Sequence, residues 1–386
     1  MSEEVFRSVW GFFSVYVVLF CLMLLLLLAL GMDIRTAFGS LVVCLANTGT
    51  STKTKIHIHT NDPGHLFDVC RQHGILKGEK ADDMIQQQHS TLKRNRGVAI
   101  LTDSAADFTD DTTNDVNIHI VPLLITIDSK SYIDKISITP NEFYRAYEQS
   151  PDRTKTSQPS LGDFKRQYEY LTSHYESIIA LHIPQCSSGT MDTSLNAAKM
   201  LTKNNEVTVI DTRHVSAAQG MIVEYAAKAA QLGYDRDTIT TMTLNIIKQT
   251  KQYAIISDLS YAVKGGRVAK YKQRILNLIK ATPILGFSEQ GKPILLTIVR
   301  NNSKKLIKFI KYINKNLENN SQYRIVIEHC NNIEGANTLL HLARETFTNV
   351  EKIDIVEVSP ALGVHTGPGA LGIATQVITE IKPSND

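Results

Sequence analysis

The chain has 386 residues, of which 43% are hydrophobic and 20% are charged, and its formal net charge is +3. This is an ordinary globular balance with room for two or three domains, and because lysine and arginine are spread along the chain, nucleic acid is not expected as a partner. The five cysteines are odd in number and widely spaced, which argues against a disulfide framework or a cysteine zinc site and favours a reducing compartment.

The amino-terminal segment, residues 1–40, is dominated by an apolar run. Residues 9–32 carry no charge and exceed the roughly 20 residues that a helix needs to cross a bilayer. The residues around Met32 make a poor signal-peptide cleavage site, so we expect an uncleaved transmembrane helix that anchors a cytoplasmic-facing protein in the inner membrane. Arg7 and Arg35 flank the run evenly and leave its orientation open. The alternative is a truncated or misassigned start of the chain.

Residues 41–96 are expected to form a small α/β segment followed by a polar linker. Strands are predicted at 41–45 and 55–59, a turn at 61–64, and a helix from His65. His57 and His59 share one face of the second strand and Asp62 follows, which would suit half of a metal site. Two histidines on one face more often belong to a polar sheet face, so no metal is predicted.

A buried strand opens the next segment at residues 98–101 and is followed by Thr102, Asp103 and Ser104. Ligands of parallel α/β sheets collect beyond the carboxyl ends of strands, so Ser104 is a candidate ligand-binding residue. Asp103 and Asp107 are as well suited to capping the segment that follows. A further strand is predicted over 117–127, and a helix over 140–149 capped by Thr139.

Two hydroxyl-rich segments each precede a predicted helix. In the first, Thr156, Ser157 and Ser160 lie on a proline-containing turn before a helix that begins near Leu161. In the second, a strand over 178–183 breaks at Pro184 and a helix begins near Gly189. The second segment carries three hydroxyl side chains, those of Ser187, Ser188 and Thr190.

The start of a helix has unpaired N–H groups at the positive end of its dipole, so each of these segments could hold a carboxylate or a phosphate. Both could converge on one anion. The simpler alternative is that Ser188 only caps its helix.

Strands and helices alternate up to about residue 253, which predicts a parallel sheet with helices on both faces. After that point the predicted strands, at 284–287, 294–300 and 323–329, have the spacing of a mixed or antiparallel sheet. The helix predicted over 304–317 has a lysine-rich face that we expect to be solvated. Arg267 follows Gly265 and Gly266 in a tight turn, where its guanidinium could contact a carboxylate or phosphate or simply face solvent.

The last motif, residues 365–372, has the glycine spacing of a dinucleotide-binding loop. No strand with a ribose-binding acid can follow in the residues that remain, so a nucleotide is not expected. What remains is a glycine loop that carries His365 and Thr366.

Six of these motifs, in this order, resemble the DegV family, the fatty-acid-binding subunits of bacterial fatty acid kinase. They are TDSAADF (102–108), TSQPS (156–160), SSGT (187–190), IDTRHVSAAQG (210–220), LSYAVKGGRV (259–268) and HTGPGALG (365–372). The resemblance covers residues 97–382 and implies an α/β fold, with a parallel-sheet domain over 97–253 and an α+β domain over 254–386. Residues 41–90 resemble the tail of the carboxy-terminal domain of the kinase subunit, without its ATP-binding domain.

The resemblance implies a lipid carrier rather than an enzyme, with a long-chain fatty acid as ligand, the catalytic subunit of a fatty acid kinase as partner, and no cofactor. Thr156 and Ser188 would hydrogen-bond the carboxylate, and Arg267 and His365 would lie at the mouth of the site. Two alternatives stay open. One is a membrane-tethered scaffold that binds no lipid, and the other is an acyl hydrolase with Ser188 as nucleophile and His365 as base.

Overall fold

The computed structural model describes residues 21–25, 58–60, 62–73, 81, 97–109, 117–201, 207–256, 258–266, 281–300 and 303–383. The chain forms two compact units, Met1–Gly74 and Ile75–Asp386. In the first unit, helix α3 (Pro63–His73) begins two residues before its predicted start, with Pro63 at its first position and the Asp62 carboxylate accepting from the backbone N–H of His65 at 2.9 Å. His57 and the strand predicted at 41–45 lie outside the described residues.

No helix in the described part of the chain is both long and apolar enough to cross a membrane. Of the span predicted over 9–32, only the helical residues 21–25 are described. The predicted transmembrane helix, and the membrane anchoring inferred from it, therefore have no support from the structure. The described residues also contain no group of three or more His, Cys, Asp or Glu side chains that could hold a metal ion.

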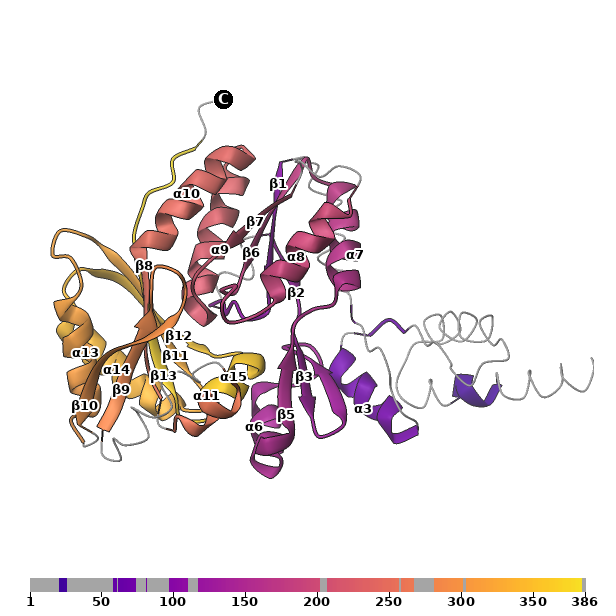
Figure 1. Ribbon diagram of the computed structural model, residues 1–386, viewed down its shortest axis with the longest axis horizontal. Coiled ribbons are helices and arrows are strands. Elements are labelled where there is room, and N and C mark those ends of the chain that lie inside the picture. The colour runs from indigo at the N-terminus through magenta and orange to yellow at the C-terminus, as the bar shows by residue number, and fades with distance from the viewer. Residues whose placement is uncertain are drawn as a thin grey trace, which may run out of the picture. The chain divides into compact units, whose positions relative to one another are not determined.

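The second unit begins with a four-stranded parallel sheet, as predicted. Its strand order is β2 (Ile118–Val121), β1 (Val98–Asp103), β6 (Ser177–His182) and β7 (Val207–Asp211). All six residues of β1 are buried, which is typical of a central strand covered on both faces. Helices α7 (Leu161–Thr172) and α8 (Thr190–Lys199) cover one face, and α9 (Ser216–Gln231) and α10 (Arg236–Gln249) cover the other (Figure 1).

A six-stranded mixed sheet follows. Its order is β10 (Pro293–Arg300), β9 (Ala281–Phe287), β8 (Thr250–Ile255), β13 (Leu371–Val377), β11 (Tyr323–His329) and β12 (Val350–Glu357). Only β11 and β12 pair in parallel. Helices α13 (Lys305–Lys315) and α14 (Ile333–Thr346) pack on this sheet (Figure 1). Their buried contacts include the side chains of Phe309, Ile313 and Leu339.

Helix α9 joins the two sheets. Its residues Ile222 and Val223 pack on the parallel sheet, while Ala218 and Met221 pack against Val326 and neighbouring residues of the mixed sheet. A helix that is apolar on nearly all sides is stable only when it is buried in this way. The predicted boundary between residues 253 and 254 falls inside β8, and the division into domains 97–253 and 254–386 stays a prediction.

A small antiparallel sheet, with the order β4 (Lys130–Ile133), β3 (Leu124–Ile127) and β5 (Thr154–Ser157), was not predicted. The single strand expected over 117–127 is two strands, β2 and β3, because the segment breaks at Pro122 and Leu123 and continues in a different sheet. The turn expected at Thr156 is strand β5. Helix α6 (Pro140–Gln149) completes this layer and has the predicted Thr139 cap, with Glu142 closing a capping box.

Candidate functional site

Thr156 and His365 meet although they lie far apart in the sequence. Thr156 is half-buried in β5 opposite Ile125, and its Oγ1 lies 2.9 Å from Nε2 of His365. His365 is on α15 (Pro360–Thr366), a short helix that begins at a Ser359 cap. The Tyr147 hydroxyl on α6 donates a hydrogen bond to the Val364 carbonyl at 2.9 Å, which holds α15 against α6.

Two closely packed glycines help to position His365, one beside its ring and one in the helix that carries it. A Cβ added at Gly265, which follows helix α11 (Ser260–Lys264), would lie 2.1 Å from Nδ1 of His365. A Cβ at Gly363 would lie 2.7 Å from the Tyr144 hydroxyl oxygen. The first glycine of the KGGRV motif, Gly265, therefore packs against His365. Arg267 of the same motif lies outside the described residues.

The second hydroxyl-rich segment forms a compact turn before α8. The N–H groups of Ser187 and Ser188 donate to the Pro184 carbonyl at 2.8 and 3.1 Å. The Ser188 hydroxyl lies 2.8 Å from Oγ1 of Thr190 and accepts a hydrogen bond from the Thr190 N–H at 3.2 Å. Thr190 is fully buried. The N-cap residue of α8 is Gly189, so no side chain of the N-cap residue accepts a hydrogen bond from this helix. Ser188 and Ser187 remain half-buried beside the first turn of the helix.

The two hydroxyl-rich segments contact each other through Gln158. Its Oε1 occupies the space beside Gly189, where an added Cβ would lie 2.1 Å away. Its amide nitrogen donates to the Thr193 hydroxyl on α8 at 2.6 Å. The segment with Thr156 and the segment with Ser188 thus lie side by side. Gln158 was not among the predicted site residues, although its place between Thr156 and Ser160 was a signal for it.

Ser104 makes its contacts inside the fold. It is buried, donates to Oδ2 of Asp134 at 2.6 Å and accepts from the Leu123 N–H at 3.0 Å. Asp134 in turn accepts from the Ala361 N–H at the start of α15, and burial raises the pKa of this carboxyl to about 6. Ser104 therefore supports the helix that carries His365, and none of its hydrogen bonds involves Thr156 or Ser188.

A buried apolar cluster lies next to these polar groups, and we call it the inter-sheet cluster. It is formed by residues of the small sheet, α6 and α15 together with Leu285 of the mixed sheet. Phe143 and Tyr147 stack within it, with ring centroids 5.2 Å apart. Ile125, opposite Thr156, and Val364, next to His365, belong to it. The site therefore combines half-buried hydroxyl groups, an imidazole and a helix start at the edge of apolar packing.

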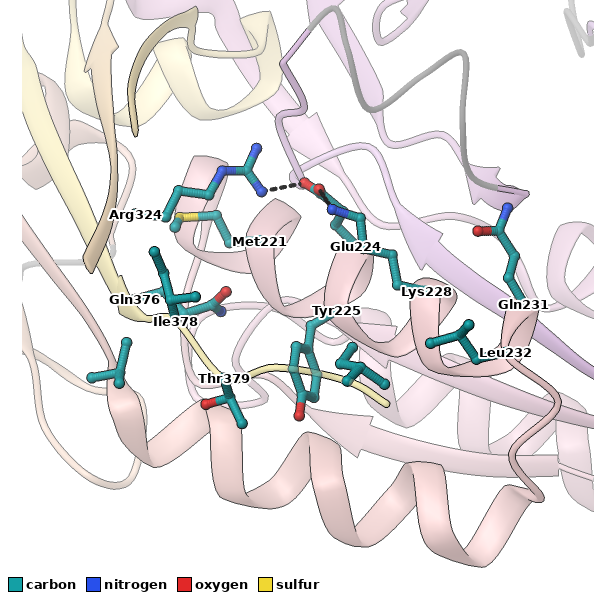
Figure 2. A pocket seen from close by; sticks show the side chains of 12 residues that line it. Met221, Glu224, Tyr225, Lys228, Gln231, Leu232, Arg324, Gln376, Ile378 and Thr379 are labelled. Atoms are coloured by element: carbon teal, nitrogen blue, oxygen red, sulfur yellow. Dashed lines mark hydrogen bonds and ion pairs between the residues drawn. The ribbon is translucent and has the colours of Figure 1, made fainter. Parts of the chain in front are cut away.

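A separate pocket of about 380 Å³ lies between α9, β11 and the segment that follows β13 (Figure 2). The Glu224 carboxylate forms ion pairs there with Arg324 and Lys228, each with a nitrogen–oxygen distance of 2.6 Å. Burial alone would raise the pKa of Glu224, but the two cations outweigh it and lower this pKa. None of the predicted site residues lines this pocket.

Family models match two parts of the chain. A model of the DegV family matches residues 97–377, and a FakA-like model, which describes the middle domain of a fatty acid kinase subunit, matches residues 19–91. The kinase-subunit resemblance is thus confirmed with a correction, because the matched part is a middle domain and not a carboxy-terminal tail. The match begins at residue 19, inside the apolar run, rather than at residue 41.

Relatives match the same region. A DegV domain-containing protein of Staphylococcus aureus is 32% identical over 274 residues, which cover 71% of this chain and 96% of the relative. A solved Thermotoga maritima protein, described as revealing a fatty acid binding function, is 27% identical with a TM-score of 0.64, over 74% of this chain and all of that one. A solved fatty acid binding DegV family protein of Streptococcus agalactiae is 26% identical with a TM-score of 0.66, over 73% of this chain and 99% of that one. This chain therefore belongs to the DegV family.

Proposed function

We propose that this protein binds a long-chain fatty acid and presents its carboxylate to the catalytic subunit of a fatty acid kinase. The observation that carries the proposal is the side-by-side placement of the Thr156–His365 pair and the turn before α8, next to the inter-sheet cluster. The fatty-acid-binding relatives from Thermotoga maritima and Streptococcus agalactiae support the ligand. The match of residues 19–91 to a kinase-subunit domain supports the partner.

The acyl tail would supply most of the affinity. Each buried methylene contributes about 0.8 kcal/mol, so a tail of about 14 methylenes offers on the order of 11 kcal/mol before the costs of association. Side chains of the inter-sheet cluster would line the path of the tail. The cluster draws residues from the small sheet, from α15 and from the mixed sheet, and small rearrangements among these elements would admit the chain.

The head group would be held mainly by neutral donors. In this proposal Thr156 and Ser188 donate to the carboxylate, Thr190 orients Ser188, and Ser187 lies at the rim. The start of α8 adds a favourable dipole. Donors of this kind fix a carboxylate without the ion pair that would weaken it as a nucleophile toward ATP. His365, which is hydrogen-bonded to Thr156, and Arg267 would lie at the mouth, where the kinase would act.

The hydrolase alternative is less well supported. It needs the Ser188 hydroxyl to be activated by His365. His365 Nε2 is hydrogen-bonded to Thr156 instead, and the Ser188 hydroxyl is hydrogen-bonded to Thr190.

Lipid extraction and mass spectrometry of the purified protein test the binding step. We expect a co-purifying fatty acid in the wild-type protein and its loss in a Thr156→Ala, Ser188→Ala double variant. A Ser303→Ala, Thr338→Ala double variant, which removes two exposed hydroxyls elsewhere, is the matched control. Equal loading of both double variants would refute the site.

The kinase step is tested separately, by adding a catalytic subunit with ATP and measuring acyl phosphate. Arg267→Ala should lower its formation while leaving the loading unchanged.

A further inference from the structure

Four buried side chains form one chain of hydrogen bonds at the carboxyl end of β6. Oδ2 of Asp103 lies 3.0 Å from Nδ1 of His182, whose Nε2 lies 2.8 Å from the Ser194 hydroxyl. The Tyr168 hydroxyl lies 2.5 Å from the same Ser194 oxygen. All four side chains belong to residues with 0% exposure. The sequence patterns did not single out His182, Ser194 or Tyr168.

The donors and acceptors in this chain have a definite order. The Asp103 carboxylate also accepts from the N–H groups of Ile183 and Ala105 and from the Gln219 amide, at 3.0, 3.1 and 3.3 Å. With these donors around it, the carboxylate is satisfied as an anion, so Nδ1 of His182 carries the proton. In the neutral imidazole Nε2 then accepts from Ser194, which leaves Ser194 to accept from Tyr168. Burial raises the pKa of Tyr168, which keeps its hydroxyl a donor.

Carboxylate, imidazole and hydroxyl follow each other here as they do in a serine-hydrolase relay. A substrate cannot reach them, because Ser194 lies within α8 and Phe164 packs edge-on against His182 with ring centroids 5.2 Å apart. These side chains can therefore hold the elements that carry them in place, but they cannot act on a substrate.

The chain connects the two helices that follow the hydroxyl-rich segments. Tyr168 lies on α7, which begins directly after Ser160, and Ser194 lies on α8, one turn after Thr190. Ser194 is hydrogen-bonded to His182, the last residue of β6, and through it to Asp103 at the end of β1, and Tyr168 joins this chain through Ser194. The segment that links Thr156 in β5 to the start of α7 contains Gln158, so a shift of α7 against α8 would displace this segment relative to Gly189 and Ser188.

We infer that His182, Ser194 and Tyr168 are positioning residues for the carboxylate site, an inference that rests on the proposed function. They act by holding α7 and α8 in one relative placement, so that the two segments before these helices present their hydroxyls to the same head group. A site built on two segments tolerates displacements of only fractions of an ångström.

The test compares two ligands with the same tail, a saturated long-chain fatty acid and the corresponding fatty alcohol. The variants are Ser194→Ala and Tyr168→Phe. Tyr323→Phe is the matched control, because Tyr323 is a buried tyrosine of the mixed sheet whose hydroxyl accepts a single hydrogen bond, from the Glu318 N–H at 2.9 Å. Dissociation constants for both ligands are measured on full-length protein, and thermal unfolding establishes that each variant is folded.

We expect Ser194→Ala and Tyr168→Phe to weaken binding of the acid about fivefold or more, and to change binding of the alcohol by less than about twofold. Tyr323→Phe should leave the ratio of the two constants unchanged. A purely structural role would weaken both ligands equally, and that result would overturn the inference. If Ser194→Ala does not fold, Tyr168→Phe decides, because it removes the hydrogen bond between Tyr168 and Ser194 and keeps the one between Ser194 and His182. A wild-type protein that binds neither ligand would overturn the proposed function itself, and the inference with it.

Discussion

Gln158 packs so closely on Gly189 that a single methyl group at residue 189 would lie 2.1 Å from its Oε1 atom. This contact is where the segment that carries Thr156 meets the segment that carries Ser188. It makes the backbone of Gly189 part of the candidate site although glycine has no functional group.

Gly189→Ala should therefore lower the affinity for a fatty acid by more, in free energy, than it lowers the free energy of unfolding. Gln158 would have to swing away and lose its hydrogen bond to Thr193, at a cost of about 1 kcal/mol in the free energy of unfolding. Gly97→Ala is the control, since an added Cβ there meets no atom within 4 Å. Retained fatty acid in Gly189→Ala, with retained stability, would count against the contact as a determinant of the site.

Thr156→Val tests the hydroxyl of Thr156 with little change of shape. It removes the 2.9 Å hydrogen bond to His365 and one donor to the ligand, so loading should fall several-fold. The melting temperature should change little, because Thr156 is only half-buried. Isothermal titration with a long-chain fatty acid measures the effect, and an affinity equal to that of the wild type would exclude Thr156 as a carboxylate ligand.

Glu328 should make the stability of the protein depend on pH. Burial raises the pKa of this carboxyl to about 8, although it accepts hydrogen bonds from Gln252 and from the Ala217 N–H. The folded state then holds a proton that the unfolded state releases above its pKa of about 4.3. The contribution of Glu328 to stability should therefore fall as pH rises toward about 8, by at most about 1.4 kcal/mol per pH unit for one proton, and become level above it.

Denaturant unfolding at several pH values measures this slope. The part between about pH 7 and 8 belongs to Glu328, because the pKa of Asp134 is raised only to about 6. His119 and His214, whose pKa values burial lowers to about 4, change stability mainly below about pH 6.5. Glu328→Gln should flatten the slope there, and Glu380→Gln, at an exposed position, should not. A slope that is the same in all three proteins would contradict the assignment.

Arg324→Met separates the pocket of Figure 2 from the candidate site. The change removes the ion pair with Arg324 from the Glu224 carboxylate, whose side chain is 7% exposed, and keeps the one with Lys228, so the free energy of unfolding should fall by about 2 to 3 kcal/mol. Fatty acid loading of the folded variant should equal that of the wild type. Loss of loading at unchanged stability would place the ligand in this pocket instead.

Local signals in the sequence predicted much of the fold. The continuous apolar run at Val98 and the strand predicted over 178–183, which is β6 in the structure, indicated the parallel sheet, and Thr139 and Leu161 marked the starts of α6 and α7. The small antiparallel sheet was missed because its strands are only four residues long and because β5 pairs with β3 from beyond helix α6. Pairing of that kind leaves little local periodicity.

The polar parts of the site were predicted in kind but not in detail. Hydroxyl-rich helix starts are visible in a sequence, whereas the packing of Gly265 against His365 depends on tertiary structure. Asp103 was considered as a cap of the segment that follows its strand, and its carboxylate does accept from the Ala105 N–H, yet it also binds His182 from the neighbouring strand. Side chains buried among apolar neighbours, such as Ser194, carry no sequence signal that distinguishes them from core positions.

A crystal structure of the protein with a saturated long-chain fatty acid tests the central claim most directly. We predict that the carboxylate lies within hydrogen-bond distance of the Thr156 and Ser188 hydroxyls and that the tail runs among side chains of the inter-sheet cluster, past Ile125 and Val364. A carboxylate bound at Arg324 and Lys228, or a tail that lies outside the inter-sheet cluster, would contradict the account.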